Sequence, residues 1–278
     1  MKFFAKAGVP MPPGSRLERA IARIRASNEP GKLDSYSDLD LATLAEAFRT
    51  TWDAFLVTHA WKSRPRRNSP FPASRLACFA EGADLPEDDP VPKPRSTQFE
   101  LFVTAQFVLG GADVHVGEPD LRFLYHGEYL GIAAKRITKR RRQTVAGGIR
   151  DARHQLRDNG VRGFIALNLD SWANDLFVTV ESEEYGRHFN RALEEAHHEF
   201  AKTPEEDFVM GALIYNHSIG WERAASGELT LRWAEGSQYV RFSEDPKEEE
   251  KAVEFFEPLT ARGYTGLKEA GALIVARK

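Results

Sequence analysis

Cysteine is almost absent from this sequence. Cys78 is the single copy, so the chain forms no internal disulfide and carries no paired-thiol redox motif. No apolar run approaches the roughly 18 residues that a membrane-spanning helix requires, and no signal-peptide pattern opens the chain. Glycine-rich phosphate loops, a nucleophile elbow and zinc-ligand spacings are missing as well. We therefore expect a soluble cytoplasmic protein with no membrane partner.

Excess positive charge is also missing. The 278-residue chain has a net charge of −3 at pH 7 and a pI of about 6.3. Binding of nucleic acid through bulk charge is thereby excluded, and any such binding must be local. The chain does have 42% hydrophobic and 11% aromatic residues, which predicts a packed core in one large domain or one domain with an extension.

The first part of the chain has a helical pattern. Ser15 is a suitable N-cap for a helix over 15–27, and Asp38 for a second helix from 39 to about 58 with a continuous apolar stripe. Between 62 and 95 frequent prolines and charges predict a long irregular connection.

This change of character places a domain boundary after residue 94. Residues 1–94 form an N-terminal helical region with a Pro-rich connection, and residues 95–278 form the second domain. The N-terminal region carries no recognisable chemistry. We expect it to position substrate, to form a homodimer or to bind a partner protein.

The second domain has a readable order of elements. A buried helix, three short strands in a meander, a helix and a buried strand are predicted over 96–109, 112–116, 120–125, 129–137, 143–158 and 161–169. A helix, two strands and a charged helix follow, over 182–202, 208–218, 228–233 and from about 245. This order predicts an α/β fold of the mixed α+β kind.

Asp120 and Lys135 are the residues most suited to chemistry. Two carboxylates on adjacent strand ends can share Mg²⁺, which polarises a phosphodiester and lowers the pKa of a bound water. A nearby Lys can stabilise the developing negative charge. Asp120 and Lys135 supply two of these three parts. Taken alone, however, Lys135 followed by Arg136 is equally typical of an edge strand whose charges discourage pairing.

Positions 133 and 134 and the residue Glu100 bear on the hypothesis of a metal-dependent site at Asp120 and Lys135. Residues 133 and 135 lie on the same face of the predicted strand, whereas Ala134 lies on the other. Glu100 interrupts an almost wholly apolar helix, where an unpaired buried carboxylate would be costly. Either Glu100 faces solvent on a narrow stripe with Thr104, or it reaches the site.

The order of Glu100, Pro119-Asp120, Ala133-Ala134-Lys135 and Gln155 resembles the PD-(D/E)xK nuclease superfamily over residues 95 to 170. The resemblance implies a restriction-endonuclease-like core, with a central mixed sheet flanked by helices and a helical N-terminal extension. It implies a Mg²⁺-dependent nuclease, with Mn²⁺ as an alternative ion, that hydrolyses DNA phosphodiester bonds as an endonuclease. RNA stays open as a substrate. The implied catalytic positions are Glu100, Asp120, Ala133, Lys135 and Gln155, and the implied metal positions are Glu100, Asp120 and Ala133.

Position 133 departs from the family pattern, which has Glu or Asp where this chain has Ala. One explanation is a natural loss that leaves a catalytically inactive nucleic-acid-binding module of the same fold. The other is a carboxylate-to-Ala substitution made to trap an inactive nuclease. Retention of Glu100, Asp120 and Lys135 favours the second. Glu128 lies at the opposite end of the strand and is a poor substitute.

Positive charge is densest directly after this motif. These residues are predicted to neutralise backbone phosphates without reading sequence, although a solvated loop is the alternative. The set is Arg136, Lys139, Arg140, Arg141, Arg142, Arg150 and Arg153, together with Lys135. A protein-interaction domain is a third hypothesis, based on the helical N-terminal region and the acidic C-terminal region.

Overall fold

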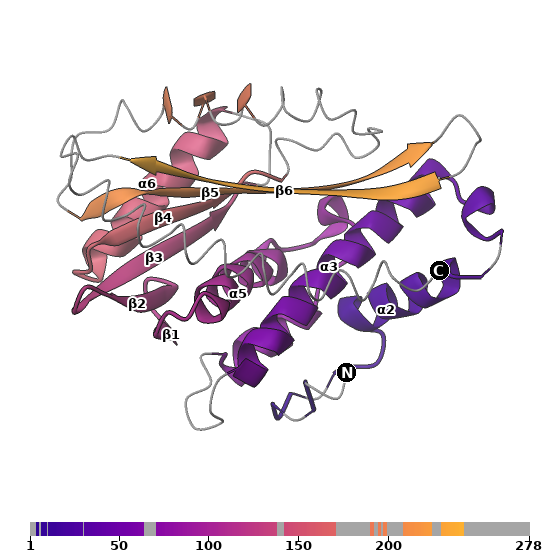
Figure 1. Cartoon of the computed structure of the whole chain (residues 1–278), viewed down its shortest axis with the longest axis horizontal. Helices are drawn as coiled ribbons and strands as arrows, with labels where there is room; N and C mark the ends of the chain where they lie inside the picture. The colour runs from indigo at the N-terminus through magenta and orange to yellow at the C-terminus, as the bar shows by residue number, and fades with distance from the viewer. Residues whose placement is uncertain are drawn as a thin grey trace.

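The computed structural model describes most of the chain up to Asp170 and two long strands beyond it. The described residues are 4–5, 7–9, 11–29, 31–63, 71–137, 142–170, 190–191, 194–195, 197–198, 208–223 and 229–241. A mixed sheet is flanked by helices on both faces, as Figure 1 shows. The mixed α/β class expected from the sequence is confirmed at this level.

The six strands of the sheet lie in chain order. Their bounds are β1 Val114–Val116, β2 Leu121–Tyr125, β3 Glu128–Arg136, β4 Gly163–Asn168, β5 Val209–Arg223 and β6 Leu229–Arg241. The first three form the predicted antiparallel meander. β4 runs parallel to both β3 and β5, and β6 returns antiparallel along β5. β5 and β6 are longer than the predicted strands over 208–218 and 228–233.

In the described part of the chain, helices pack on the sheet and on one another. Their bounds are α2 Arg16–Ser27, α3 Asp38–Ser63, α4 Ala73–Ala80, α5 Lys93–Leu109 and α6 Arg142–Asp158. α6 packs on β3 and β4, and α5 packs on β3 and on α3 and α4. The expected order of α5, the three-stranded meander, α6 and β4 is therefore present. Figure 1 shows that α2, α3 and α5 lie together beside the sheet.

The helix starts follow from side-chain capping. The Ser15 hydroxyl accepts from the amide of Glu18 and caps α2, as predicted. The predicted cap of α3 is wrong by one residue, because Asp38 is already helical. Ser37 accepts from the amide of Asp40 at 3.3 Å, and Asp40 accepts in return from the amide of Ser37 at 3.1 Å. This reciprocal pair satisfies amides that the first turn leaves without partners.

The predicted irregular connection over 62–95 is wrong in part, because it contains α4 and the start of α5. Proline is compatible with the residue before a helix and with the first turn, where no intrahelical donor is needed. Pro72 therefore precedes α4 in an extended conformation, and Pro94 lies in the first turn of α5. The apolar side chains of Leu76 and Phe79 are fully buried.

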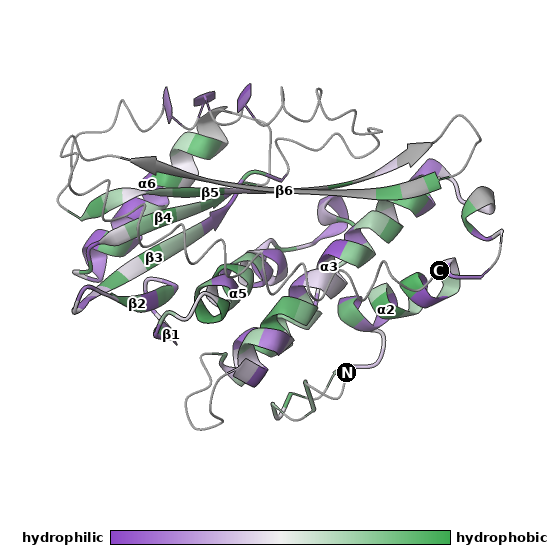
Figure 2. Cartoon of the chain, viewed as in Figure 1, coloured by the Kyte–Doolittle hydropathy of each residue, from purple (hydrophilic) through white to green (hydrophobic). Residues whose placement is uncertain are grey.

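Two apolar clusters lie on opposite sides of the sheet. One contains side chains from α3, α4, α5 and β2, and the other lies between α6 and the sheet. Alternation along β3 sends Ala134 into the first and Ala133 into the second. Figure 2 shows the hydrophobic residues that follow the central strands and the helices beside them.

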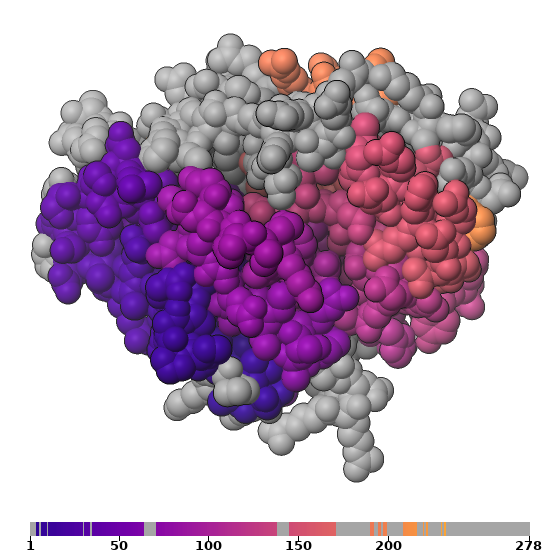
Figure 3. All heavy atoms as spheres, turned by 180° about the vertical axis from the view of Figure 1, so that it is seen from behind, coloured from indigo at the N-terminus to yellow at the C-terminus, as the bar shows by residue number. Residues whose placement is uncertain are grey.

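The first cluster continues across the sequence boundary proposed at residue 94. Phe4, Leu76 and Phe79 pack in the same cluster as Phe102 and Phe164. Figure 3 shows from behind that the N-terminal helices and the following segments form one continuous surface. The N-terminal region thus packs directly on the second domain.

Two predicted helices lie outside the described residues in whole or in part. The C-terminal helix from about 245 is wholly outside them, and so is most of the helix predicted over 182–202. In the described parts of the chain, no helix has the length and apolarity needed to cross a bilayer.

Gly163 allows a close approach of two neighbouring strand backbones. A Cβ at Gly163 would overlap the carbonyl oxygen of Gly131 in β3. We expect Gly163→Ala to lower the free energy of unfolding by about 3 kcal/mol or more, because β3 and β4 must separate. Urea unfolding measures this change.

Gly147 is the matched control, because a Cβ there meets no atom within 4 Å. Gly147→Ala should raise the free energy of unfolding by about 0.5–1 kcal/mol through the helix preference of Ala. Equal stability of Gly163→Ala and the wild-type protein would contradict the described β3–β4 packing.

Candidate active site

Asp120 lies at the entrance to β2, opposite Ala133 of β3. The strand register pairs Leu121 with Ile132, and one further step places Asp120 across from Ala133. Asp120 is 6% exposed, and its Oδ2 accepts from the amide of Ala134 at 2.7 Å. The backbone of β3 therefore fixes this carboxylate at the end of the strand pair.

Lys135 and Gln155 meet over this carboxylate. Lys135 Nζ donates to Oε1 of Gln155 on α6 and lies 4.0 Å from Asp120 Oδ2. The amide group of Gln155 contacts Asp120 Oδ1 and Glu118 Oε2, each at 3.1 Å, and also the carbonyl of Pro119. Gln155 thus links α6 to both strands of the site.

Glu100 comes to the same site from α5. Its carboxylate pairs with Arg75 of α4, its charge raises the pKa of Asp120, and the charge of Lys135 acts to lower the pKa of Glu100. The alternative of a solvent stripe shared with Thr104 is wrong. Thr104 is 1% exposed, and its hydroxyl donates to the backbone carbonyl of Glu100.

The surroundings of Asp120 and Glu100 disfavour the ionised form of both carboxyl groups. Burial raises the pKa of Asp120 to about 7, and the charge of Glu100 adds to this effect. Lys135 and the Ala134 amide oppose it. Burial likewise raises the pKa of Glu100, against the charges of Arg75 and Lys135. Both carboxylates would therefore gain from a further positive charge.

Ala133 contributes no polar group to this arrangement. Its methyl is fully buried in the apolar cluster beneath α6. Within the part of the chain that the structure describes, no three His, Cys, Asp or Glu side chains converge as metal ligands. The residues present therefore do not fit a complete Mg²⁺ site.

The predicted phosphate-binding residues do not form one cluster among the described residues. Strand alternation turns Arg136 away from Lys135, into a pocket lined by α3 and α5. Arg153 is 8% exposed and lies on the inner side of α6, whereas Arg150 is exposed. Arg136 thus points away from Lys135, and the side chain of Arg153 is buried instead of facing solvent. Lys139, Arg140 and Arg141, and the side chain of Arg142, are outside the described residues.

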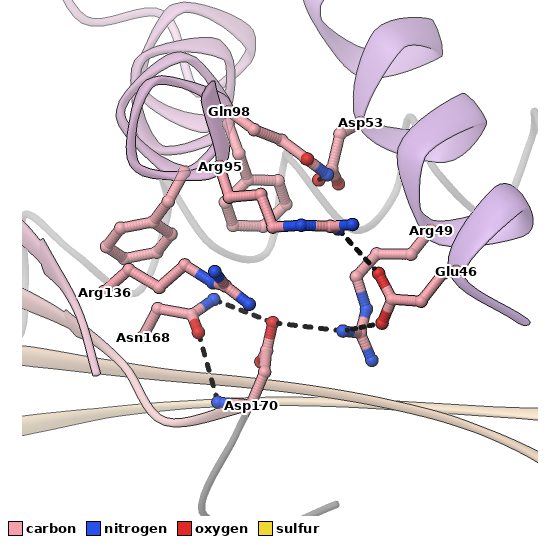
Figure 4. A pocket seen from close by; sticks show the side chains of 10 residues that line it. Glu46, Arg49, Asp53, Arg95, Gln98, Arg136, Asn168 and Asp170 are labelled. Atoms are coloured by element: carbon pink, nitrogen blue, oxygen red, sulfur yellow. Dashed lines mark hydrogen bonds and ion pairs between the residues drawn. The ribbon is translucent and has the colours of Figure 1, made fainter. Parts of the chain in front are cut away.

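A buried charged network on the other face of the sheet is absent from the sequence-based predictions. It surrounds a cavity of about 20 Å³, which has room for one water molecule. Figure 4 shows its polar side chains pointing toward one another from α3, α5 and the ends of β3 and β4. They are Glu46, Arg49, Asp53, Arg95, Gln98, Arg136, Asn168 and Asp170.

Glu46 is the central acceptor of this network. It accepts from Arg49 at 2.7 Å and from Arg95 at 2.9 Å. Asp170 accepts from Asn168 at 2.8 Å and lies 3.9 Å from Arg49. The sequence carries one signal of this network, because Glu46 and Asp53 lie on the largely apolar inner face of α3. Arg49 is three residues from Glu46, but Arg95 and Gln98, the partners of Glu46 and Asp53 on α5, are distant in sequence and could not be inferred.

No family model, curated protein or solved structure matches this chain. Its functional assignment therefore rests on the arrangement of its own residues.

Asp120 should make stability depend on pH. Its folded pKa of about 7 lies above the reference value of 3.8, so the folded state binds the extra proton between these values. Relative to Asp120→Asn, the wild-type protein should lose up to about 4 kcal/mol of unfolding free energy between pH 4 and pH 8. Urea unfolding across this range measures the difference, and parallel pH profiles would contradict it.

Glu46 should show the opposite dependence. Burial alone would raise the pKa of Glu46, but Arg49 and Arg95 hold that pKa below its usual value. Its contribution to stability is therefore present above the unfolded pKa and lost as the pH falls through the folded pKa. At pH 7, Glu46→Gln should cost about 3–5 kcal/mol.

In thermal or urea unfolding, the stability difference between Glu46→Gln and the wild-type protein should narrow as the pH falls through the lowered folded pKa of Glu46. Glu29→Gln is the matched control, because Glu29 is exposed, and it should change stability by less than about 0.5 kcal/mol. A cost at pH 7 no larger than that of the control would show that the network does not stabilise the fold.

Proposed function

We propose that this chain has the framework of a Mg²⁺-dependent endonuclease of the PD-(D/E)xK type, acting on DNA phosphodiester bonds, and that Ala133 leaves it without cleavage. One observation carries the proposal. Asp120, Ala133 and Lys135 share one face at the ends of β2 and β3, beneath Gln155 of α6. The same four positions carry the resemblance to that superfamily.

The position of Ala133 explains what a carboxylate there would do. Residues opposite each other on antiparallel strands have Cβ atoms about 4.5–5.5 Å apart. An acidic side chain at position 133 would lie beside Asp120, and such a pair can share a divalent cation. Mg²⁺ between them would polarise a phosphodiester. The raised pKa values of Asp120 and Glu100 support a site that accepts added positive charge.

Lys135 would serve at the phosphate in this arrangement. Its ammonium group is held by Gln155 and lies 4.0 Å from Asp120. A lysine fixed beside the scissile phosphate stabilises the negative charge that develops during hydrolysis. Gln155 would orient both Lys135 and Asp120.

The buried methyl of Ala133, where a metal-binding carboxylate would lie, favours a second function for this chain. It would bind nucleic acid without cutting it, as an inactive module of the same fold. Lys135 and the exposed Arg150 would then contact backbone phosphates, together with the basic segment 139–142. DNA is the proposed ligand, and RNA binding is tested as a separate outcome.

Restoring the carboxylate tests both proposals. Ala133→Glu should nick or linearise supercoiled plasmid in the presence of Mg²⁺ or Mn²⁺ but not with EDTA, whereas the wild-type protein should leave plasmid intact. Adding Asp120→Asn or Lys135→Ala to Ala133→Glu should lower the rate at least about 100-fold. Agarose gels of plasmid time courses give the rates.

Ala133→Gln is the matched control, because it has the size of Glu without its charge. Both variants bear the same overpacking cost of about 1–3 kcal/mol at this buried position. Ala133→Asp is the smaller alternative if circular dichroism shows Ala133→Glu to be unfolded. Folded acidic variants that cleave no single-stranded or duplex DNA and no RNA would exclude the nuclease proposal.

A further inference from the structure

The candidate active site receives a cation from the N-terminal region. Arg75, on α4, donates from Nη1 to Oε2 of Glu100. Glu100 in turn acts electrostatically on Asp120 and Lys135. One continuous set of charges therefore connects α4 with the ends of β2 and β3, although the N-terminal region carries no motif of its own.

The guanidinium of Arg75 has further hydrogen-bond donors besides the one that Glu100 accepts. Its side chain is 30% exposed, whereas that of Glu100 is 15% exposed. Among the described residues, Glu100 is its one hydrogen-bonding partner, through Nη1. Nε–H and an Nη2–H lie along one edge of the planar group, and this edge matches two oxygens of a phosphate.

The negative charge of the site also favours a role for Arg75 in binding phosphate. The charge of Glu118 disfavours ionisation of Glu100 and Asp120, that of Glu100 disfavours ionisation of Asp120, and Lys135 Nζ lies 4.0 Å from Asp120 Oδ2. A phosphodiester entering beside these carboxylates would be repelled unless further cations met it. Arg75 is a further cation, and it donates directly to a carboxylate of this cluster.

We propose that Arg75 is a phosphate-binding residue of the candidate active site, contacting a backbone phosphate of the bound nucleic acid while Glu100 orients its guanidinium. This inference rests on the proposed nucleic-acid function. It gives the N-terminal region a direct part in substrate binding. Arginine suits this task better than lysine, because its planar fork binds two phosphate oxygens at once.

A purely structural ion pair makes different predictions. A partly exposed pair contributes at most about 1 kcal/mol to folding, and its loss would leave ligand affinity unchanged. A phosphate contact instead adds to the salt dependence of binding, because each neutralised phosphate releases counterions. The salt dependence of affinity therefore separates the two roles.

The test measures the Kd of the full-length chain for a fluorescein-labelled 30-base-pair DNA duplex and for a labelled RNA of the same sequence. Fluorescence anisotropy is recorded in EDTA over a KCl series, at a temperature where every variant is folded. Arg75→Gln should weaken binding about fivefold to tenfold and lower the slope of log K against log salt by about 0.9. Arg75→Lys should restore the slope but only part of the affinity.

Glu100→Gln provides the complementary change. It removes a negative charge beside the bound phosphate but keeps an oxygen that can accept from Arg75, so binding should tighten by about twofold to fivefold. Adding Arg75→Gln to Glu100→Gln should weaken binding by about fivefold to tenfold, as it does in the wild-type background. Arg25→Gln is the matched control, because Arg25 is exposed on α2, and it should keep the wild-type affinity and slope.

The outcomes separate the inference from the function on which it rests. If the wild-type chain binds neither probe at low salt, the proposed function and the role of Arg75 both fail. If the wild-type chain binds and Arg75→Gln matches Arg25→Gln, the role of Arg75 is overturned while the proposed function stands. A fall in melting temperature without a change in Kd or slope would likewise overturn the role of Arg75.

Discussion

The hydrogen bond from the Ala134 amide to the Asp120 carboxylate is the interaction on which the rest of the site depends. It ties the start of β2 to the end of β3 and fixes the direction of a buried acid. Gln155 can then contact Asp120 and Lys135 together, because α6 crosses from β3 to the parallel β4. Glu100 completes the arrangement from α5. Sheet pairing and helix packing therefore create the site before any ligand is present.

The alternation of side chains along β3 separates two charged environments. Lys135 lies toward α6 and the candidate active site, whereas its neighbour Arg136 enters the buried network between α3 and α5. The pKa values of the buried acids in the two environments are shifted in opposite directions. Burial dominates at Asp120 and favours its neutral form, while the arginines around Glu46 favour the ionised form. Acid should therefore weaken the network while it relieves the cost of the buried charge at Asp120.

Local patterns are enough to predict much of the fold and part of the site. The meander of β1 to β3, the helix α6 and the relation of positions 133 and 135 all follow from periodicity and turn residues. The prolines around α4 predict a break instead of a helix, although Pro72 directly precedes that helix. The contacts of Arg75 with Glu100, and of Glu46 with Arg95, join residues far apart in sequence. Only tertiary packing brings such partners together.

The loss of folding stability caused by the buried carboxyl group of Asp120 helps to explain why position 133 is Ala. A carboxyl group whose pKa is raised by burial lowers stability at neutral pH, and a neutral side chain would avoid that loss. General decay of a site would remove such a residue along with its neighbours. Here Asp120, Lys135 and Gln155 still meet, the charge of Glu100 acts on Asp120, and in the proposed nuclease framework the methyl of Ala133 takes the place of a second carboxylate. If the proposed nuclease function is correct, this pattern favours the loss of a single acidic side chain over general decay of the site.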